Sequence, residues 1–265
     1  MQWVADVGGA TGRSIAYVGG LAEISANALR LLVLSPLKRG RMLERAVHEA
    51  MAAGVGAIPI ISLIAFFVGV IIALQGAYEL QRLGAMQLVS SLVAIAITRE
   101  LGPLITAIVV IGRSGSAFAA EIGTMRVTEE LDALKTMALD PVAFLVVPKF
   151  LAMALMLPCL AIWADLMGVL GGALFGVVGG GYTFAGYLLA TRDALLLRDI
   201  TSGVIKSLVF GIMITAVGCQ EGFSTGSGAE EVGRSTTSAV VISILLVIVI
   251  DLIFTGLFYL ARGGN

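Results

Sequence analysis

Five apolar stretches of membrane-spanning length dominate this chain of 265 residues. A bilayer core of about 30 Å requires about 20 residues of helix. Lipid offers no partner for backbone polar groups, so each stretch is predicted to be a helix, and the spacing does not suit a β-barrel. The stretches are Val55–Ala77, Leu88–Gly112, Phe150–Val178, Ile200–Cys219 and Thr237–Leu260. The third is long enough to contain a sixth, broken span.

Composition excludes a soluble domain and a nucleic-acid-binding protein. Hydrophobic residues make up 58% of the chain and charged residues 13%, with a mean hydropathy of +1.00. A soluble domain of this size would need more polar surface. The 17 basic and 18 acidic residues leave none of the basic excess of nucleic-acid binders. Cys159, Cys219 and the single His48 form neither a disulfide framework nor a metal site.

The fold expected is an all-α integral membrane protein with two parts. Residues 1–54 mix leucines with basic residues and are predicted to form an N-terminal interfacial amphipathic segment, with a turn at Ser35-Pro36. Residues 55–262 are predicted to form the five-span membrane domain. Lys and Arg outside the spans number eleven on the side of the N-terminus and four on the other. This bias predicts a cytoplasmic N-terminus and an outer C-terminus.

The segment between spans two and three is predicted to contain a short amphipathic helix over residues 124–139. Its apolar positions recur at helical spacing at Val127, Leu131, Leu134 and Ala138. Thr124 or Thr128 would cap it, and Asp140-Pro141 would stop it. Glu129 and Glu130 suit its first turn. The helix is either a simple connector or a docking element for a cytoplasmic partner.

Charged residues within the spans are the candidates for function. They are Arg99, Glu100, Asp165, Lys206 and Asp251. Each costs at least ~2.5 kcal/mol in hydrocarbon, so each must face protein or water. They either pair with one another, with Lys206 joining Asp165 or Asp251, or line a substrate cavity.

Arg99 and Glu100 favour the cavity hypothesis. Adjacent side chains on a helix point about 100° apart, so the two cannot pair well with each other. An arginine in an apolar cavity is suited to bind a phosphate with two hydrogen bonds. Pro103 removes one helix hydrogen bond shortly afterwards, which favours a local opening of the helix.

Span three carries glycines at intervals of four residues, at Gly168, Gly172 and Gly176. Such spacing lets two helices approach closely, within or between protomers. The chain contains no nucleotide-binding Gly-x-x-x-x-Gly-Lys-Ser/Thr pattern and no plausible catalytic triad. An enzyme is therefore not expected, and nucleotide energy would have to come from a separate subunit.

Seven short strings, in this order and spacing, resemble the MlaE/YrbE permease family, the membrane subunits of lipid-transporting ABC systems associated with MCE-domain proteins. The strings are Thr98–Pro103, Gly112–Ala117, Ala120–Met125, Thr128–Leu134, Leu139–Pro141, Ile205–Phe210 and Val232–Thr237. They span most of residues 50–260, whereas the first 45 residues match only in character.

The resemblance implies a homodimer of five-span subunits in the bacterial inner membrane, with a periplasmic C-terminus. Cytoplasmic ATPase subunits that bind ATP and Mg²⁺, a periplasmic MCE-domain protein and a STAS-domain protein are its implied partners. The implied substrate is a membrane lipid, usually a glycerophospholipid, that meets Arg99 and Glu100 in a cavity at the dimer interface. The segment between spans two and three would be the coupling helix. Its implied ATPase contacts are Glu121, Thr124, Met125, Arg126, Glu129, Glu130, Leu131 and Leu134.

Two other hypotheses follow from the same residues. A stand-alone secondary transporter or channel would use the charged residues within the spans as an ion path, but no internal repeat of the kind common in such carriers is visible. A non-transporting scaffold would explain the short helix between spans two and three. It would not explain the charges in the membrane, because a scaffold gains nothing from them.

Overall fold

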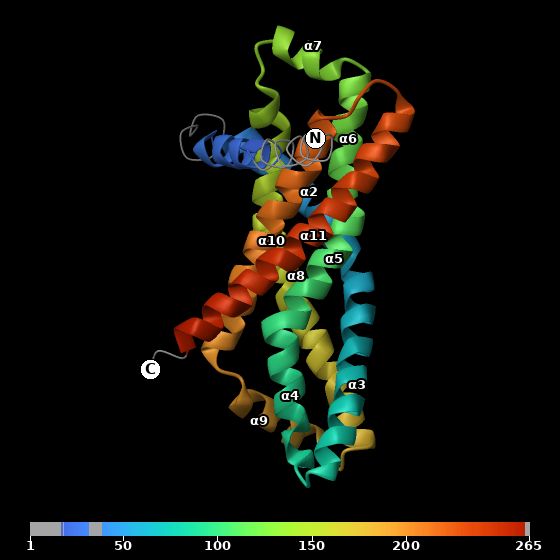
Figure 1. Ribbon diagram of the computed structural model, residues 1–265, viewed down its shortest axis with the longest axis vertical. Helices are drawn as coiled ribbons and strands as arrows, with labels where there is room; N and C mark the ends of the chain where they lie inside the picture. Colours follow the sequence, from blue (N-terminus) through green and yellow to red (C-terminus); the bar gives the residue numbers. More distant parts are fainter. Residues whose placement is uncertain (1–16, 18, 32–38, 263–265) are drawn as a thin grey trace, which may run out of the picture.

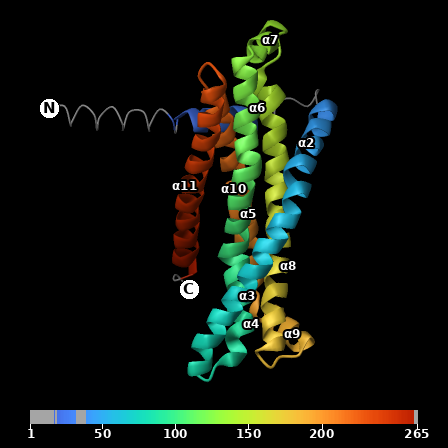
Figure 2. The same ribbon diagram turned by 90° about the vertical axis from the view of Figure 1, so that its right-hand side faces the viewer.

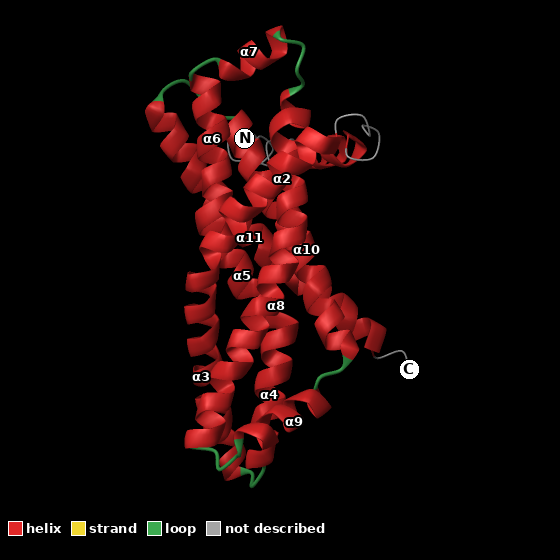
Figure 3. Ribbon diagram, turned by 180° about the vertical axis from the view of Figure 1, so that it is seen from behind, coloured by secondary structure: helices red, strands yellow, loops and turns green. Residues whose placement is uncertain are grey.

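The computed structural model describes residue 17, residues 19–31 and residues 39–262 (Figure 1). Within these residues the secondary structure is helical and contains no strand (Figure 3). Five helical stretches are long and apolar enough to cross a membrane, which confirms the predicted fold class. They are Met42–Arg82, Met86–Val127, Val142–Val178, Leu197–Phe223 and Ala229–Leu260.

The five stretches extend beyond the apolar runs that predicted them. They comprise helices interrupted by 3-10 and π turns. These are α2 (Arg39–Gly54), η2 (Val55–Ala57), α3 (Ile58–Arg82), η3 (Met86–Leu88), α4 (Val89–Ala96), η4 (Ile97–Leu101), α5 (Gly102–Val110), η5 (Ile111–Gly115), α6 (Ser116–Val127), η6 (Val142–Val146), α8 (Val147–Val178), α10 (Leu197–Phe223) and α11 (Ala229–Arg262). The apolar run sets a minimum length, whereas the helix ends are set by residues that break helices.

Glycines and a proline place several of those ends. The first long helix stops before Gly84, which has a φ of 68°, and Gly181 follows α8 with a φ of 72°. Only glycine adopts such values readily. Pro141 precedes η6, so the third membrane helix begins eight residues before the predicted Phe150. The third apolar region continues through Pro158 as one helix and forms no sixth span within the described residues.

The described parts of the N-terminal segment form two helices with different positions. Residues 19–31 form a helix that lies across the end of the bundle near α7, as both views show (Figures 1 and 2). By contrast, α2 continues through η2 into α3 and packs against α8. The boundary predicted at residue 54 lies within this continuous helix, and as a domain boundary it stays a prediction. The predicted turn at Ser35-Pro36 lies outside the described residues.

The predicted helix over residues 124–139 is divided in two. Residues up to Val127 complete α6, and a separate short helix, α7, spans Glu130–Thr136. Glu129 separates them with a φ of 62°, a left-handed conformation that stops a helix. The hydroxyl of Thr128 bonds back to the carbonyl of Thr124 in α6, so neither threonine caps α7. A short helix between spans two and three is nevertheless present, as predicted.

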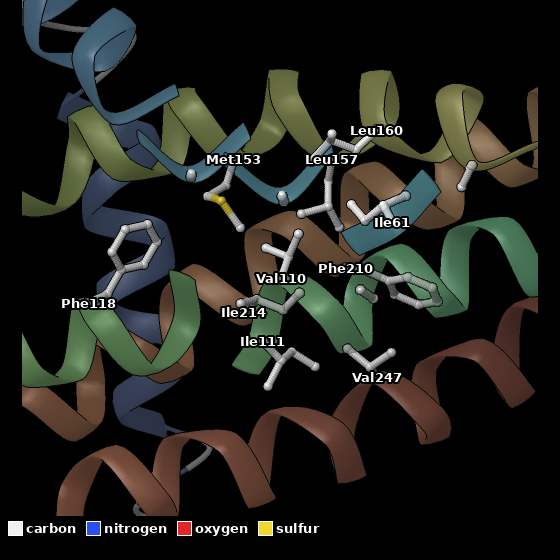
Figure 4. Packing of buried hydrophobic residues seen from close by; sticks show 14 of the residues in the cluster. Ile61, Val110, Ile111, Phe118, Met153, Leu157, Leu160, Phe210, Ile214 and Val247 are labelled. Atoms are coloured by element: carbon white, nitrogen blue, oxygen red, sulfur yellow. The ribbon is translucent and has the colours of Figure 1, made fainter. Parts of the chain in front are cut away.

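The buried apolar residues of the bundle form three clusters. Helix α11 lies at the side of the bundle (Figure 2). Figure 4 shows the central part, where Leu157 of α8, Ile214 of α10 and Val247 of α11 pack together. In the most apolar part of the third stretch, which contains α8, 61% of the residues are buried. In the most apolar part of α11 only 11% are buried. Few residues of the apolar part of α11 are therefore fully buried within this chain.

An additional helix, α9 (Phe184–Ala194), connects α8 to α10 at the end opposite α7 (Figure 1). We did not predict it. Thr183 caps it, because its hydroxyl accepts a hydrogen bond of 3.1 Å from the backbone N–H of Gly186. Tyr187 of α9 is fully buried, and burial raises the pKa of its hydroxyl to about 12.

Candidate functional site

The centre of the candidate site is a π-helical turn in the second membrane helix. This turn, η4, spans Ile97–Leu101 and contains Arg99 and Glu100, directly before Gly102-Pro103. Pro103 has no N–H to bond to the carbonyl of Arg99, and the wider turn is the local opening that this causes. As a result, Arg99 and Glu100 find different partners, both on α10.

Lys206 of α10 is the hub of a buried polar network, with a side chain that is only 1% exposed. Its ammonium lies 2.5 Å from a carboxylate oxygen of Glu100 and 2.9 Å from one of Asp251 on α11. It also donates a hydrogen bond of 2.8 Å to the hydroxyl of Thr255, which in turn donates to Glu100 at 3.1 Å. Three membrane helices thus meet at one buried cation.

Arg99 forms a second ion pair beside the first. Its Nε lies 3.5 Å from a carboxylate oxygen of Asp199, whose side chain is 5% exposed. Asp199 also accepts a hydrogen bond of 3.2 Å from the backbone N–H of Leu196, at the start of α10. Sequence reasoning missed Asp199, which directly precedes the fourth predicted span, Ile200–Cys219. An acidic residue after a helix start was the available signal, because such residues satisfy unpaired N–H groups there.

The network borders a cavity of about 90 Å³. Its lining residues are Arg99, Glu100, Arg198, Asp199, Ser202, Lys206, Thr255 and Phe258. Together with Asp251, these lining residues include three cationic and three acidic side chains, so their formal charges cancel. Charge balance of this kind lowers the cost of keeping ionised groups in a membrane.

The structure separates Asp165 from this network. Lys206 pairs with Asp251 and Glu100, which decides between the two partners considered from the sequence. A side-chain oxygen of Asp165 is buried against Gly102 and has no hydrogen-bond partner within the described residues.

The glycines of α8 provide close contacts within this chain. Gly168 packs against the backbone of α3 at Gly69 and against the side chain of Ile97. A Cβ at Gly172 would lie 2.5 Å from the hydroxyl of Tyr187, and one at Gly176 would lie 2.6 Å from its ring. Two of the three glycines therefore accommodate α9, an element that the sequence did not predict.

The residues expected at the ATPase contact have different environments. Glu121 of α6 pairs with Lys149 at 2.8 Å, and Arg126 donates a hydrogen bond to the backbone carbonyl of Phe223. Thr124 is exposed and Met125 is half-buried against the core near α7. These four residues lie in the last turns of α6, at the end of the second membrane helix.

Helix α7 itself has one buried and one exposed face. Leu131 and Leu134 are each 7% exposed and pack into the bundle, so they hold α7 in place. Glu129, Glu130 and Asp132 are exposed. The ammonium of Lys135, 2.8 Å from Asp132, holds the pKa of that carboxyl below its usual value. The surface available to a partner is thus charged.

No cluster of three or more potential metal-binding side chains occurs within the part of the chain that the structure describes.

Comparison with known proteins decides the family. The family described as Permease MlaE matches residues 46–257. The chain belongs to the MlaE permease family.

Three relatives match between 75% and 96% of the chain. A probable ABC transporter permease protein of Rickettsia conorii is 37% identical over 96% of this chain and 96% of its own length. The intermembrane phospholipid transport system permease protein MlaE of Haemophilus influenzae is 34% identical over 80% and 82%. The chloroplastic protein TRIGALACTOSYLDIACYLGLYCEROL 1 of Arabidopsis thaliana is 39% identical over 75% and 57%.

These findings confirm the resemblance to the MlaE family that the sequence strings indicated. The chain is a multi-pass membrane protein and a non-catalytic permease of the ABC transporter type. Membership in this family favours the ABC permease over a stand-alone ion-coupled transporter or a scaffold.

Proposed function

We propose that this chain is the permease subunit of an ATP-driven transporter that moves glycerophospholipid between the inner and outer membranes of a bacterium. The name of the Haemophilus influenzae relative supports phospholipid as the substrate. The polar network around Lys206 supports a site for a charged head group, because it keeps ionised groups next to a cavity within the membrane.

The size of the cavity carries the proposal of a homodimer. Pockets that hold small ligands typically enclose about 300–1,000 Å³. One chain offers only about 90 Å³ beside the network, which is too little for a lipid. A second copy would complete the cavity, and the exposed apolar face of α11 is available to pack against it.

The remaining partners follow from the same proposal. A separate cytoplasmic ATPase binds ATP and Mg²⁺, because this chain has no nucleotide-binding motif, and it contacts the charged face of α7. A STAS-domain protein accompanies the ATPase, and a periplasmic MCE-domain protein covers the end that carries α9. The N-terminus is then cytoplasmic and the C-terminus periplasmic, in agreement with the distribution of basic residues.

Replacing Arg99 with alanine tests the head-group role. If the guanidinium binds the lipid phosphate, R99A lowers phospholipid transport by about tenfold or more, since a hydrogen bond to a charged group contributes roughly 1.5–3 kcal/mol. Transport is measured as transfer of labelled phospholipid from proteoliposomes containing the complete transporter. The control is R192A, which removes an exposed arginine of α9 that does not line the cavity.

R99A complexes are also checked for bound ATPase by gel filtration, so that a failure to assemble is recognised. An assembled R99A transporter that moves phospholipid at the rate of the R192A control would show that Arg99 does not bind the head group.

A further inference from the structure

A second buried lysine lies near the α7 end of the bundle. Lys149 of α8 has a side chain that is 1% exposed, and its ammonium lies 2.6 Å from Glu49 of α2 and 2.8 Å from Glu121 of α6. It also lies 4.8 Å from the ring centre of Phe118, one turn before Glu121 on α6. One ammonium therefore connects three helices that are distant in sequence.

Stability alone explains this arrangement poorly. A buried ion pair is often no more stabilising than apolar residues of similar volume, because the charges lose their hydration. Apolar side chains fill the surrounding core, including Ile122 and Val146. What the ion pairs add is geometric, because both bonds to Lys149 form only when α2, α6 and α8 are in one relative position.

The two bonds to Lys149 differ in how easily they can break. The side chain of Glu49 is 24% exposed, whereas that of Glu121 is 47% exposed. Water can replace the lysine as a partner of Glu121 at small cost. If Glu121 departs, the ammonium keeps its bond to Glu49. The contact between Glu121 and Lys149 is thus the one suited to open and close.

The position of Glu121 connects this contact to α7. Glu121 lies on α6, which ends at Val127 and leads through Glu129 into α7. A displacement of α7 by a partner therefore acts first on the end of α6. All three helices at Lys149 belong to membrane stretches, but of the three, α6 is the one that packs against α7.

We propose that Lys149 is a positioning residue for transport and that its bond to Glu121 is a releasable contact between the α6–α7 corner and the membrane helices α2 and α8. This inference rests on the proposed function, in which an ATPase displaces α7. The contact is closed in the present structure, and opening it would let α6 move while α2 and α8 remain joined through Glu49 and Lys149.

The test is E121Q in the complete transporter in proteoliposomes, with ATP hydrolysis and transfer of labelled phospholipid measured on the same sample. We expect ATP hydrolysis to persist while phospholipid moved per ATP falls about fivefold, which corresponds to about 1 kcal/mol for a partly exposed ion pair. The matched control is E231Q, which neutralises one carboxylate of the exposed pair with Arg234 near the start of α11. It should leave the ratio unchanged.

A purely structural role would lower hydrolysis and transfer together, and an unchanged ratio in E121Q would show that the contact is not used. Either result overturns the proposal.

Hydrogen exchange on the purified transporter separates this inference from the proposed function. Residues 116–127 should exchange faster in E121Q than in E231Q, whether or not the wild type transfers phospholipid. If the wild type hydrolyses ATP but moves no phospholipid, the proposed function fails, and the exchange rates still decide whether Glu121 holds α6. Equal exchange in the two variants would exclude the contact.

Discussion

At the scale of single residues, Lys206 determines the charge balance of the candidate site. Its ammonium lies between Glu100 and Asp251, from the second and fifth membrane helices, while its own side chain is almost fully buried. Removing the ammonium would leave two carboxylates close together without a cation. An uncompensated buried charge is much less favourable than the neutral pair it replaces.

We therefore expect K206M to destabilise the protein by about 3 kcal/mol, the lower end for breaking a buried pair, because both carboxylates are partly exposed. Thermal unfolding of the purified protein in detergent measures the loss. The double variant E100Q/K206M should recover part of the stability, since it also removes one of the two carboxylates. If K206M unfolds at the wild-type temperature, the ion pairs do not stabilise the fold.

At the scale of secondary-structure elements, short irregular segments position the functional side chains. The π turn η4 directs Arg99 and Glu100 to different partners on α10, and the left-handed Glu129 separates α7 from α6. Similarly, α9 covers the glycines of α8 with a single large side chain, Tyr187. The long helices form the bundle, and these irregular segments determine where the functional side chains lie.

The contact of α8 with α9 predicts the effect of a larger residue at Gly172. A Cβ there would lie 2.5 Å from the hydroxyl of Tyr187 and 2.7 Å from Val93, so G172L would displace both. Overpacking of this kind typically costs about 1–3 kcal/mol, measured as a lower temperature of thermal unfolding. The control is G233L, at an exposed position of α11 with nothing within 4 Å of a Cβ. Equal stability of the two variants would contradict the close packing of α9.

At the scale of the whole molecule, the two ends of the bundle and its sides have different surfaces. One end carries the charged face of α7 and the other carries α9, while α11 presents an apolar face along one side (Figures 1 and 2). This distribution suits a subunit that meets an ATPase at one end and a second copy at its side, as proposed.

The exposed charges of α7 predict how the ATPase binds. Reversing both Glu129 and Glu130 to lysine places like charges against a surface that we expect to be basic, so affinity for the ATPase should fall at least about tenfold. Titration of the ATPase onto the detergent-purified double variant measures this loss. A single reversal at Glu79, on α3 at the opposite end, is the control. Wild-type affinity in the double variant would exclude this face of α7 as the contact.

The sequence by itself determined the fold class, the number of spans within the described residues and five of the charged residues inside them. The physical reason is that hydrocarbon imposes a length on each apolar run and a cost on each charge, and both can be read from local composition. Arg99, Glu100, Lys206 and Asp251 could therefore be recognised as functional candidates without a structure.

Only the tertiary structure decided which of these groups meet. Lys206 bonds to Glu100 and lies against Asp251, Arg99 pairs with Asp199, and Asp165 remains apart. Lys149 likewise joins acidic residues that lie 28 and 100 positions away in the chain. Such pairings depend on how whole helices pack and rotate against one another. That packing is set by many contacts distributed over the bundle, and the spacing within any one segment does not contain it.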